Sequence, residues 1–220
     1  MNSEKTQVYF IPGMAAGSQI FRNIRFPKDK YQTHVLEWMI PEKNESIEDY
    51  AKRMAARVKS PNPILIGVSF GGVVAEEMSF FLNLKKLIII SSVKSQKELP
   101  RRMRFASATK AYKLVPTSLV LSVEDLTKFS IGPKSKKRLL LYQQYLHVRD
   151  KRYLNWALEK MVTWNRKEKL KNVIHIHGDK DMVFPIKYIN DCRVIEGGTH
   201  IMILNRGREI SEKLLAIFEE

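Results

Sequence analysis

Residues 63–78 read PILIGVSFGGVVAEEM, and this stretch decides the fold. It begins with a run of strand formers and ends with a run that favours a helix. Between the two runs stands Ser69, with Gly67 before it and Gly71 after it. A serine on such a turn from strand to helix is typical of a nucleophile elbow, where glycines avoid clashes around a strained serine backbone. The turn would lift the hydroxyl to the end of the strand, above a helix N-terminus whose N–H groups favour negative charge.

Two loops downstream carry the partners that a nucleophilic serine needs. A serine hydroxyl requires a base, and the base requires a third group to orient it. An apolar strand ends at Gly178 in a loop that contains Asp179 and Asp181, and a later short strand leads into a glycine loop with His200. The chain order is therefore Ser, Asp, His, each after a predicted strand. Open α/β sheets place their functional groups at these strand ends.

With these motifs the sequence resembles the α/β-hydrolase superfamily from Val8 to about Phe218, apart from an insert at residues 93–170. The matched motifs are FIPGMAAG at residues 10–17, the serine elbow, Gly178-x-x-Asp181-x-x-x-Pro185 and Gly198-Thr199-His200. Two positions depart from the commonest pattern. Val68 precedes the serine where histidine is frequent, and Pro12-Gly13 replaces histidine-glycine. Neither position supplies side-chain chemistry, so the departures leave the superfamily in place and the subfamily unassigned.

The resemblance implies a role for five residues. Ser69 would be the nucleophile and His200 the base. The acid of the family follows the loop glycine by three residues, which selects Asp181 over Asp179. The backbone N–H groups of Met14 and Phe70 would form the oxyanion hole.

Each candidate also has a simpler interpretation. Ser69 is a residue type that favours a helix N-cap, and Asp181 suits a local turn. His175 and His177 lie two apart on a strand and therefore face the same side. We expect packed or hydrogen-bonded strand histidines there rather than metal ligands, because no third ligand has a recognisable spacing. We predict no metal, and His34 and His147 belong to no motif.

Composition places the chain among globular proteins of a single domain, residues 1–220. It has 44% hydrophobic and 28% charged residues, which is ordinary for that class. No apolar run approaches the roughly 18 residues that span a bilayer, and no convincing signal peptide begins the chain. The single cysteine, Cys192, cannot form an internal disulfide. We therefore expect a reducing cytoplasm.

Alternating patterns predict an α/β fold with a mostly parallel sheet of about six strands and helices on both faces. The family commonly has two strands more before the first one here. The expected strands are residues 8–11, 33–37, 64–67, 87–91, 173–177 and 193–195. The expected helices of the core are residues 46–58, 73–82 and 210–218.

Residues 93–170 lack strand signals and contain helical patterns, such as residues 136–147 and 153–161. In the family an insert at this place forms a helical cap over the active site, so we expect a cap insert here. Residues 94–171 hold 20 Lys and Arg against 6 Asp and Glu, a balance of +14 out of a net +15. The basic excess therefore belongs to the insert.

The charge has three interpretations. The basic residues could form a solvated surface without a specific role, or they could attract an anionic or carrier-bound substrate. They could also contact an acidic partner, an anionic membrane or nucleic acid. Specific nucleic-acid binding is the weakest, since no binding motif accompanies the charge. The basic clusters are Arg101-Arg102-x-Arg104 and Lys134-x-Lys136-Lys137-Arg138. The insert also carries apolar residues that would either line an acyl pocket or attach the insert to the core, namely Phe105, Leu114, Phe129, Trp156 and Trp164.

We therefore expect a serine hydrolase that cleaves a small-molecule carboxylic ester or thioester through an acyl-enzyme, without a cofactor. A lyase or a C–C bond hydrolase on the same three residues is the alternative among enzymes. A binding protein that keeps the fold without catalysis is the alternative outside them.

Overall fold

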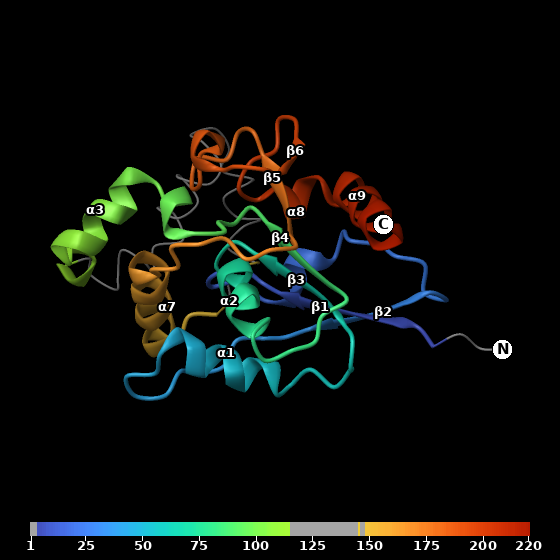
Figure 1. Cartoon of the computed structure of the whole chain (residues 1–220), viewed down its shortest axis with the longest axis horizontal. Coiled ribbons are helices and arrows are strands. Elements are labelled where there is room, and N and C mark those ends of the chain that lie inside the picture. The colour runs from blue at the N-terminus through green and yellow to red at the C-terminus, as the bar shows by residue number, and fades with distance from the viewer. Residues whose placement is uncertain (1–3, 115–144, 146–147) are drawn as a thin grey trace.

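The computed structural model describes residues 4–114, 145 and 148–220 and contains one six-stranded sheet (Figure 1). Every neighbouring pair of strands is parallel, in the order β2-β1-β3-β4-β5-β6. The expected α/β class and six strands are confirmed, with bounds shifted by at most two residues. The strands are β1 (Thr6–Ile11), β2 (Tyr31–Val35), β3 (Ile64–Val68), β4 (Lys86–Ile90), β5 (Val173–Gly178) and β6 (Arg193–Ile195).

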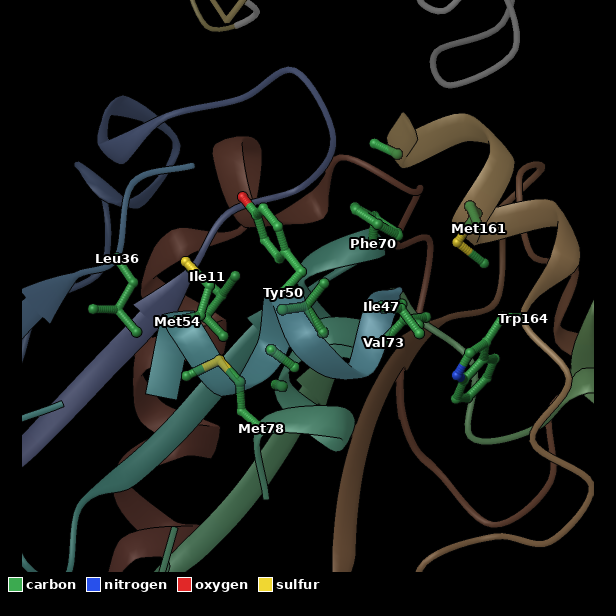
Figure 2. Close-up of a cluster of buried hydrophobic side chains, with 14 of the residues drawn as sticks. Ile11, Leu36, Ile47, Tyr50, Met54, Phe70, Val73, Met78, Met161 and Trp164 are labelled. Carbon is green, nitrogen blue, oxygen red and sulfur yellow. The ribbon is translucent and has the colours of Figure 1, made fainter. Parts of the chain in front are cut away.

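Alternation along the strands divides the core into two layers. On β1, Tyr9 and Ile11 belong to one buried cluster, whereas Val8 and Phe10 belong to the other. The first cluster lies under the helices α1 (Ile47–Ala55), α2 (Phe70–Met78) and α7 (Lys151–Thr163), and Figure 2 shows side chains of these three helices gathered in it. The second cluster lies under the helices α8 (Met202–Asn205) and α9 (Gly207–Glu219), on the opposite face (Figure 1). Successive side chains of a strand point to opposite faces of the sheet, and both faces are apolar because helices cover each of them.

The three expected helices of the core are present, with ends shifted by up to four residues. α1 (Ile47–Ala55) has Ser46 as its N-cap, whose hydroxyl accepts the N–H of Asp49 at 3.0 Å. α2 (Phe70–Met78) begins three residues before the expected helix, directly after Ser69. α9 (Gly207–Glu219) closes the chain, preceded by a short helix, α8 (Met202–Asn205), that the sequence did not indicate. Short 3-10 turns are η1 (Ser18–Phe21), η2 (Gln96–Glu98), η3 (Ala111–Leu114) and η4 (Ile186–Tyr188).

Between β4 and β5 the structure describes helices and no strand in the ranges it covers. These helices are α3 (Arg101–Thr109) and α7 (Lys151–Thr163), the second of which contains the expected helix at 153–161. The helix expected at 136–147 lies outside the described residues except for Tyr145. Within the described part of the chain, no helix combines the length and the apolar character that crossing a membrane requires.

Candidate active site

Ser69 occupies a strained turn between β3 and α2. Its φ of 54° and ψ of −122° lie in a region that L-residues rarely adopt. A Cβ on Gly67 would lie 2.3 Å from the carbonyl oxygen of Gly71, and one on Gly71 would lie 2.3 Å from that of Pro12. The expected strain at the serine, and the need for both glycines, are therefore confirmed. Strain of this kind persists only where the surrounding structure imposes it.

The structure brings together the three side chains that the sequence singled out. His200 Nε2 lies 2.9 Å from Ser69 Oγ, and His200 Nδ1 lies 2.8 Å from Asp181 Oδ2. A carboxylate only accepts hydrogen bonds, so Nδ1 carries the imidazole proton. Nε2 is then unprotonated and accepts the hydrogen bond of the serine hydroxyl. The arrangement can take a proton from Ser69 and stabilise the resulting imidazolium.

Asp181 is held by its own loop as well as by His200. Its Oδ1 accepts the N–H groups of Val183 and Phe184, each at 2.8 Å. Burial raises the pKa of this carboxyl, but the charge and hydrogen bond of His200, the nearby His177 and the Phe184 N–H outweigh burial, so the pKa lies below its ordinary value. The geometry and the pKa both favour an ionised Asp181.

Asp179, the rival in the same loop, makes no contact of this kind. Its side chain is 31% exposed, and Lys180 Nζ lies 3.9 Å from its Oδ2. The spacing after Gly178 therefore distinguished the two aspartates by position, and the structure places only Asp181 against the histidine.

The loops that carry Asp181 and His200 are in direct backbone contact. A Cβ on Gly178 would lie 2.2 Å from the carbonyl oxygen of Gly198. The same oxygen accepts the N–H of Lys180 at 2.9 Å, and the N–H of Asp179 reaches the carbonyl of Ile195 at 3.3 Å. The two glycines thus allow the ends of β5 and β6 to pack as one unit.

The loop after β1 passes beside Ser69. A Cβ on Gly13 would lie 3.5 Å from Ser69 Cβ, and the carbonyl of Gly13 accepts the N–H of Ala16 at 3.1 Å and Trp38 Nε1 at 3.0 Å. The N–H of Met14 donates to no acceptor among the described residues. Phe70 begins α2, so its N–H has no partner within that helix.

Residues between β4 and β5 contact the core in several ways. Trp156 and Trp164 are buried, and their indole N–H groups bond to the carbonyl of Glu45 at 2.9 Å and to Glu77 Oε1 at 2.8 Å. These contacts favour attachment to the core over pocket lining for the two tryptophans. Phe105 is 68% exposed. The described part of the chain does not include Phe129, the Lys134–Arg138 cluster or the side chain of Leu114.

One contact was not visible in the sequence. Arg102, on α3, donates to the carbonyls of Met182 and Val183 at 3.0 and 3.1 Å, beside Asp181. Arg102 therefore supports the acid loop, although its side chain is exposed, as are those of Arg101 and Arg104, for which no contact with this loop is seen among the described residues.

The expected strand histidines bond to each other, His177 Nδ1 to His175 Nε2 at 3.0 Å. Within the part of the chain that the structure describes, no group of three or more His, Cys, Asp or Glu is arranged to hold a metal. Cys192 is a half-buried free thiol.

No protein-family model and no curated protein sequence matches this chain. Solved structures match it over nearly its whole length. An esterase from Thermogutta terrifontis has a TM-score of 0.73 at 13% identity, covering 99% of this chain and 91% of its own. A bromoperoxidase from Bacillus anthracis has 0.71 at 15%, covering 100% and 94%, and an enol-lactonase from Burkholderia xenovorans has 0.69 at 11%, covering 99% and 93%.

Proposed function

The chain has the α/β-hydrolase fold, and from this fold and the contacts of Ser69 we propose that it is a serine hydrolase of carboxylic esters or thioesters. The observation that carries the proposal is the hydrogen-bonded series from Ser69 through His200 to Asp181, on a strained elbow. The esterase and the enol-lactonase among the similar structures are named for ester cleavage.

Each group has a place in the reaction. Ser69 Oγ attacks the carbonyl carbon while its proton passes to His200 Nε2, and Asp181 balances the imidazolium charge. The N–H groups of Phe70 and Met14 stabilise the oxyanion. The intermediate collapses, and the alkoxide or thiolate leaves with the proton from His200. A water then attacks the acyl-enzyme with His200 as base, the bond between the acyl carbon and Ser69 Oγ breaks, Oγ takes the proton back from His200, and the carboxylic acid is released.

Substitution of the nucleophile tests the proposal. Ser69→Ala should lose several orders of magnitude in turnover while its circular dichroism and Tm remain close to those of the wild type. A fluorophosphonate should label Ser69 alone, as mapped by peptide mass spectrometry. Wild-type turnover in the Ser69→Ala variant would refute the proposal.

A substrate panel separates the competing functions. It should contain p-nitrophenyl esters of short and long acids together with acyl-CoA thioesters. Turnover of one of these classes supports hydrolysis. Fluorophosphonate labelling without turnover of any of them would favour the lyase or C–C hydrolase alternative. Failure of both labelling and turnover would favour the non-catalytic binding protein, whose fold is the same.

We also propose that residues 93–170 cap the site and that their charge selects an anionic substrate, free or presented by an acidic carrier. The support is the balance of +14 over residues 94–171 and the position of Arg102 against the acid loop. A basic field raises the encounter rate with anions, and salt screens it over about 8 Å at physiological ionic strength.

The salt dependence of kcat/KM tests the role of this charge. We expect kcat/KM for an anionic ester to fall as salt rises, while a neutral ester of similar shape changes little. Joint replacement of the exposed Arg101 and Arg104 by Gln should reproduce part of the fall, and Arg102 stays in place because it holds the acid loop. Equal salt dependence for both esters would identify the segment as a solvated surface.

A further inference from the structure

Two buried histidines lie next to Asp181, and the nearer one, His177, approaches the same carboxylate oxygen as His200. Both come from β5, where a spacing of two places them on one face. His175 is 2% exposed and His177 is 0% exposed. Their rings meet edge to face with centroids 4.9 Å apart, and His177 Nδ1 lies 3.0 Å from His175 Nε2. Buried side chains with this much polar surface need a defined set of hydrogen bonds.

The contacts of His177 determine where its proton lies. Its Nε2 is 2.8 Å from the carbonyl oxygen of Phe184, which can only accept. The same Nε2 is 3.6 Å from Asp181 Oδ2, which also favours a donor at that position. Burial lowers the pKa of His177, and it lowers that of His175 well below the ordinary value, so both rings are neutral near pH 7. His177 therefore carries its proton on Nε2, and its Nδ1 accepts the Nε2–H of His175.

This arrangement reaches Asp181 in two ways. The carbonyl of Phe184 accepts the hydrogen bond of His177, and the N–H of Phe184 donates to Asp181 Oδ1. His177 therefore holds Phe184 in place, and Phe184 in turn holds the carboxylate of Asp181. In addition, His177 Nε2, whose proton is donated to Phe184, lies only 3.6 Å from Oδ2, the oxygen that accepts from His200, so the positive part of the imidazole is close to the carboxylate. A donor on this side favours the ionised carboxylate at the orientation that His200 requires.

We propose that His177 is a positioning residue for Asp181 and that His175 sets the tautomer in which His177 performs this role. The proposal rests on the proposed function, since it extends the series Ser69–His200–Asp181 by two side chains. It assigns a purpose to a buried polar pair that a strand of this kind would otherwise fill with apolar residues.

A matched pair of variants separates the hydrogen-bond donor from the packing. The amide nitrogen of Gln reaches the place of the imidazole Nε2, whereas Met has the same length and no donor. We expect His177→Met to lower kcat on a short p-nitrophenyl ester by about 10–100-fold with KM nearly unchanged, as for other residues that orient a functional group from behind. His177→Gln should recover most of kcat. His34→Met is the control and should retain wild-type kcat, because His34 lies on β2 and contacts Gln7 and Tyr9 rather than the residues of the site.

Two outcomes of the kinetics would overturn the proposal. Wild-type kcat in His177→Met would show that the donor is dispensable, and equal losses in the Met and Gln variants would assign the effect to packing. Wild-type activity of Ser69→Ala, in contrast, would refute the proposed function itself.

Nitrogen NMR of the unaltered protein labelled with ¹⁵N-histidine tests the tautomer independently of activity. We expect neutral Nε2–H forms for both His175 and His177 at pH 7, with the His177 signals identified by their loss in His177→Gln. An Nδ1–H form or a charged ring at His177 would overturn the proposal, whatever the kinetics.

Discussion

Replacement of Asp181 by Asn should remove most of the activity, because the loop dictates which way the amide faces. Oδ1 of Asp181 accepts two backbone N–H groups at 2.8 Å, so the Asn oxygen must take that position. The amide NH₂ then occupies the place of Oδ2, 2.8 Å from His200 Nδ1. A donor at this place requires an unprotonated Nδ1, so the proton of His200 moves to Nε2. His200 can then no longer accept the proton of Ser69.

The magnitude follows from this inverted tautomer. Loss of the correct tautomer, with the geometry intact, lowers kcat by about 10⁴-fold, which corresponds to about 5 kcal/mol of transition-state stabilisation. Stability should change much less, since the Asn oxygen keeps both backbone hydrogen bonds. Turnover of the best p-nitrophenyl ester measures the first quantity, and urea unfolding measures the second.

Asp179→Asn is the matched control in the same loop. Its side chain is partly exposed and faces Lys180 rather than His200, so we expect it to keep most of the activity. The reasoning is refuted if Asp181→Asn keeps more than about a tenth of wild-type kcat, or if Asp179→Asn loses as much as Asp181→Asn does.

Two further substitutions test the elbow and the buried charge. Gly71→Ala places a Cβ 2.3 Å from the carbonyl oxygen of Pro12, so we expect circular dichroism to show loss of folded protein. The control Gly13→Ala places its Cβ at an ordinary 3.5 Å from Ser69 Cβ and should fold. A folded and active Gly71→Ala variant would contradict this reasoning. Burial raises the pKa of Glu76 well above its ordinary 4.5, so its contribution to stability is fully present below that pH and is lost as the pH rises through the folded-state pKa. The Tm of Glu76→Gln should therefore rise relative to the Tm of the wild type as the pH increases from 4.5 to 8. A difference in Tm that stays constant over this range would argue against a raised pKa.

The sequence predicted the parts of the fold that depend on local pattern. The strands and the turn at Ser69 could be predicted from alternating residues and from the neighbouring glycines, because each has a steric cause within a few residues. The early start of α2 was not, since Gly71 and Gly72 are poor helix formers and only the turn at Ser69 requires a helix there. α8 is one turn long and has no periodic signal of its own.

The candidate site was predicted through its motifs, and its supporting contacts were not. Asp181 followed from the resemblance to the family, in which the acid stands three residues after the loop glycine. The contacts of Arg102 and His177 with the acid loop depend on how distant segments pack, and a pair of strand histidines indicates only that both face one side. Contacts of this kind carry no sequence signature.

The close packing of Gly178 against Gly198 has a consequence for how the site opens. The acid and the base stand on loops joined through backbone atoms, whereas the nucleophile stands on β3, with β4 between it and β5. Thermal fluctuations of the sheet should therefore move Asp181 and His200 together, so that the Ser69–His200 distance lengthens before the Asp181–His200 distance does. Near its melting temperature the protein should lose reactivity toward fluorophosphonate while the imidazole–carboxylate pair is still intact.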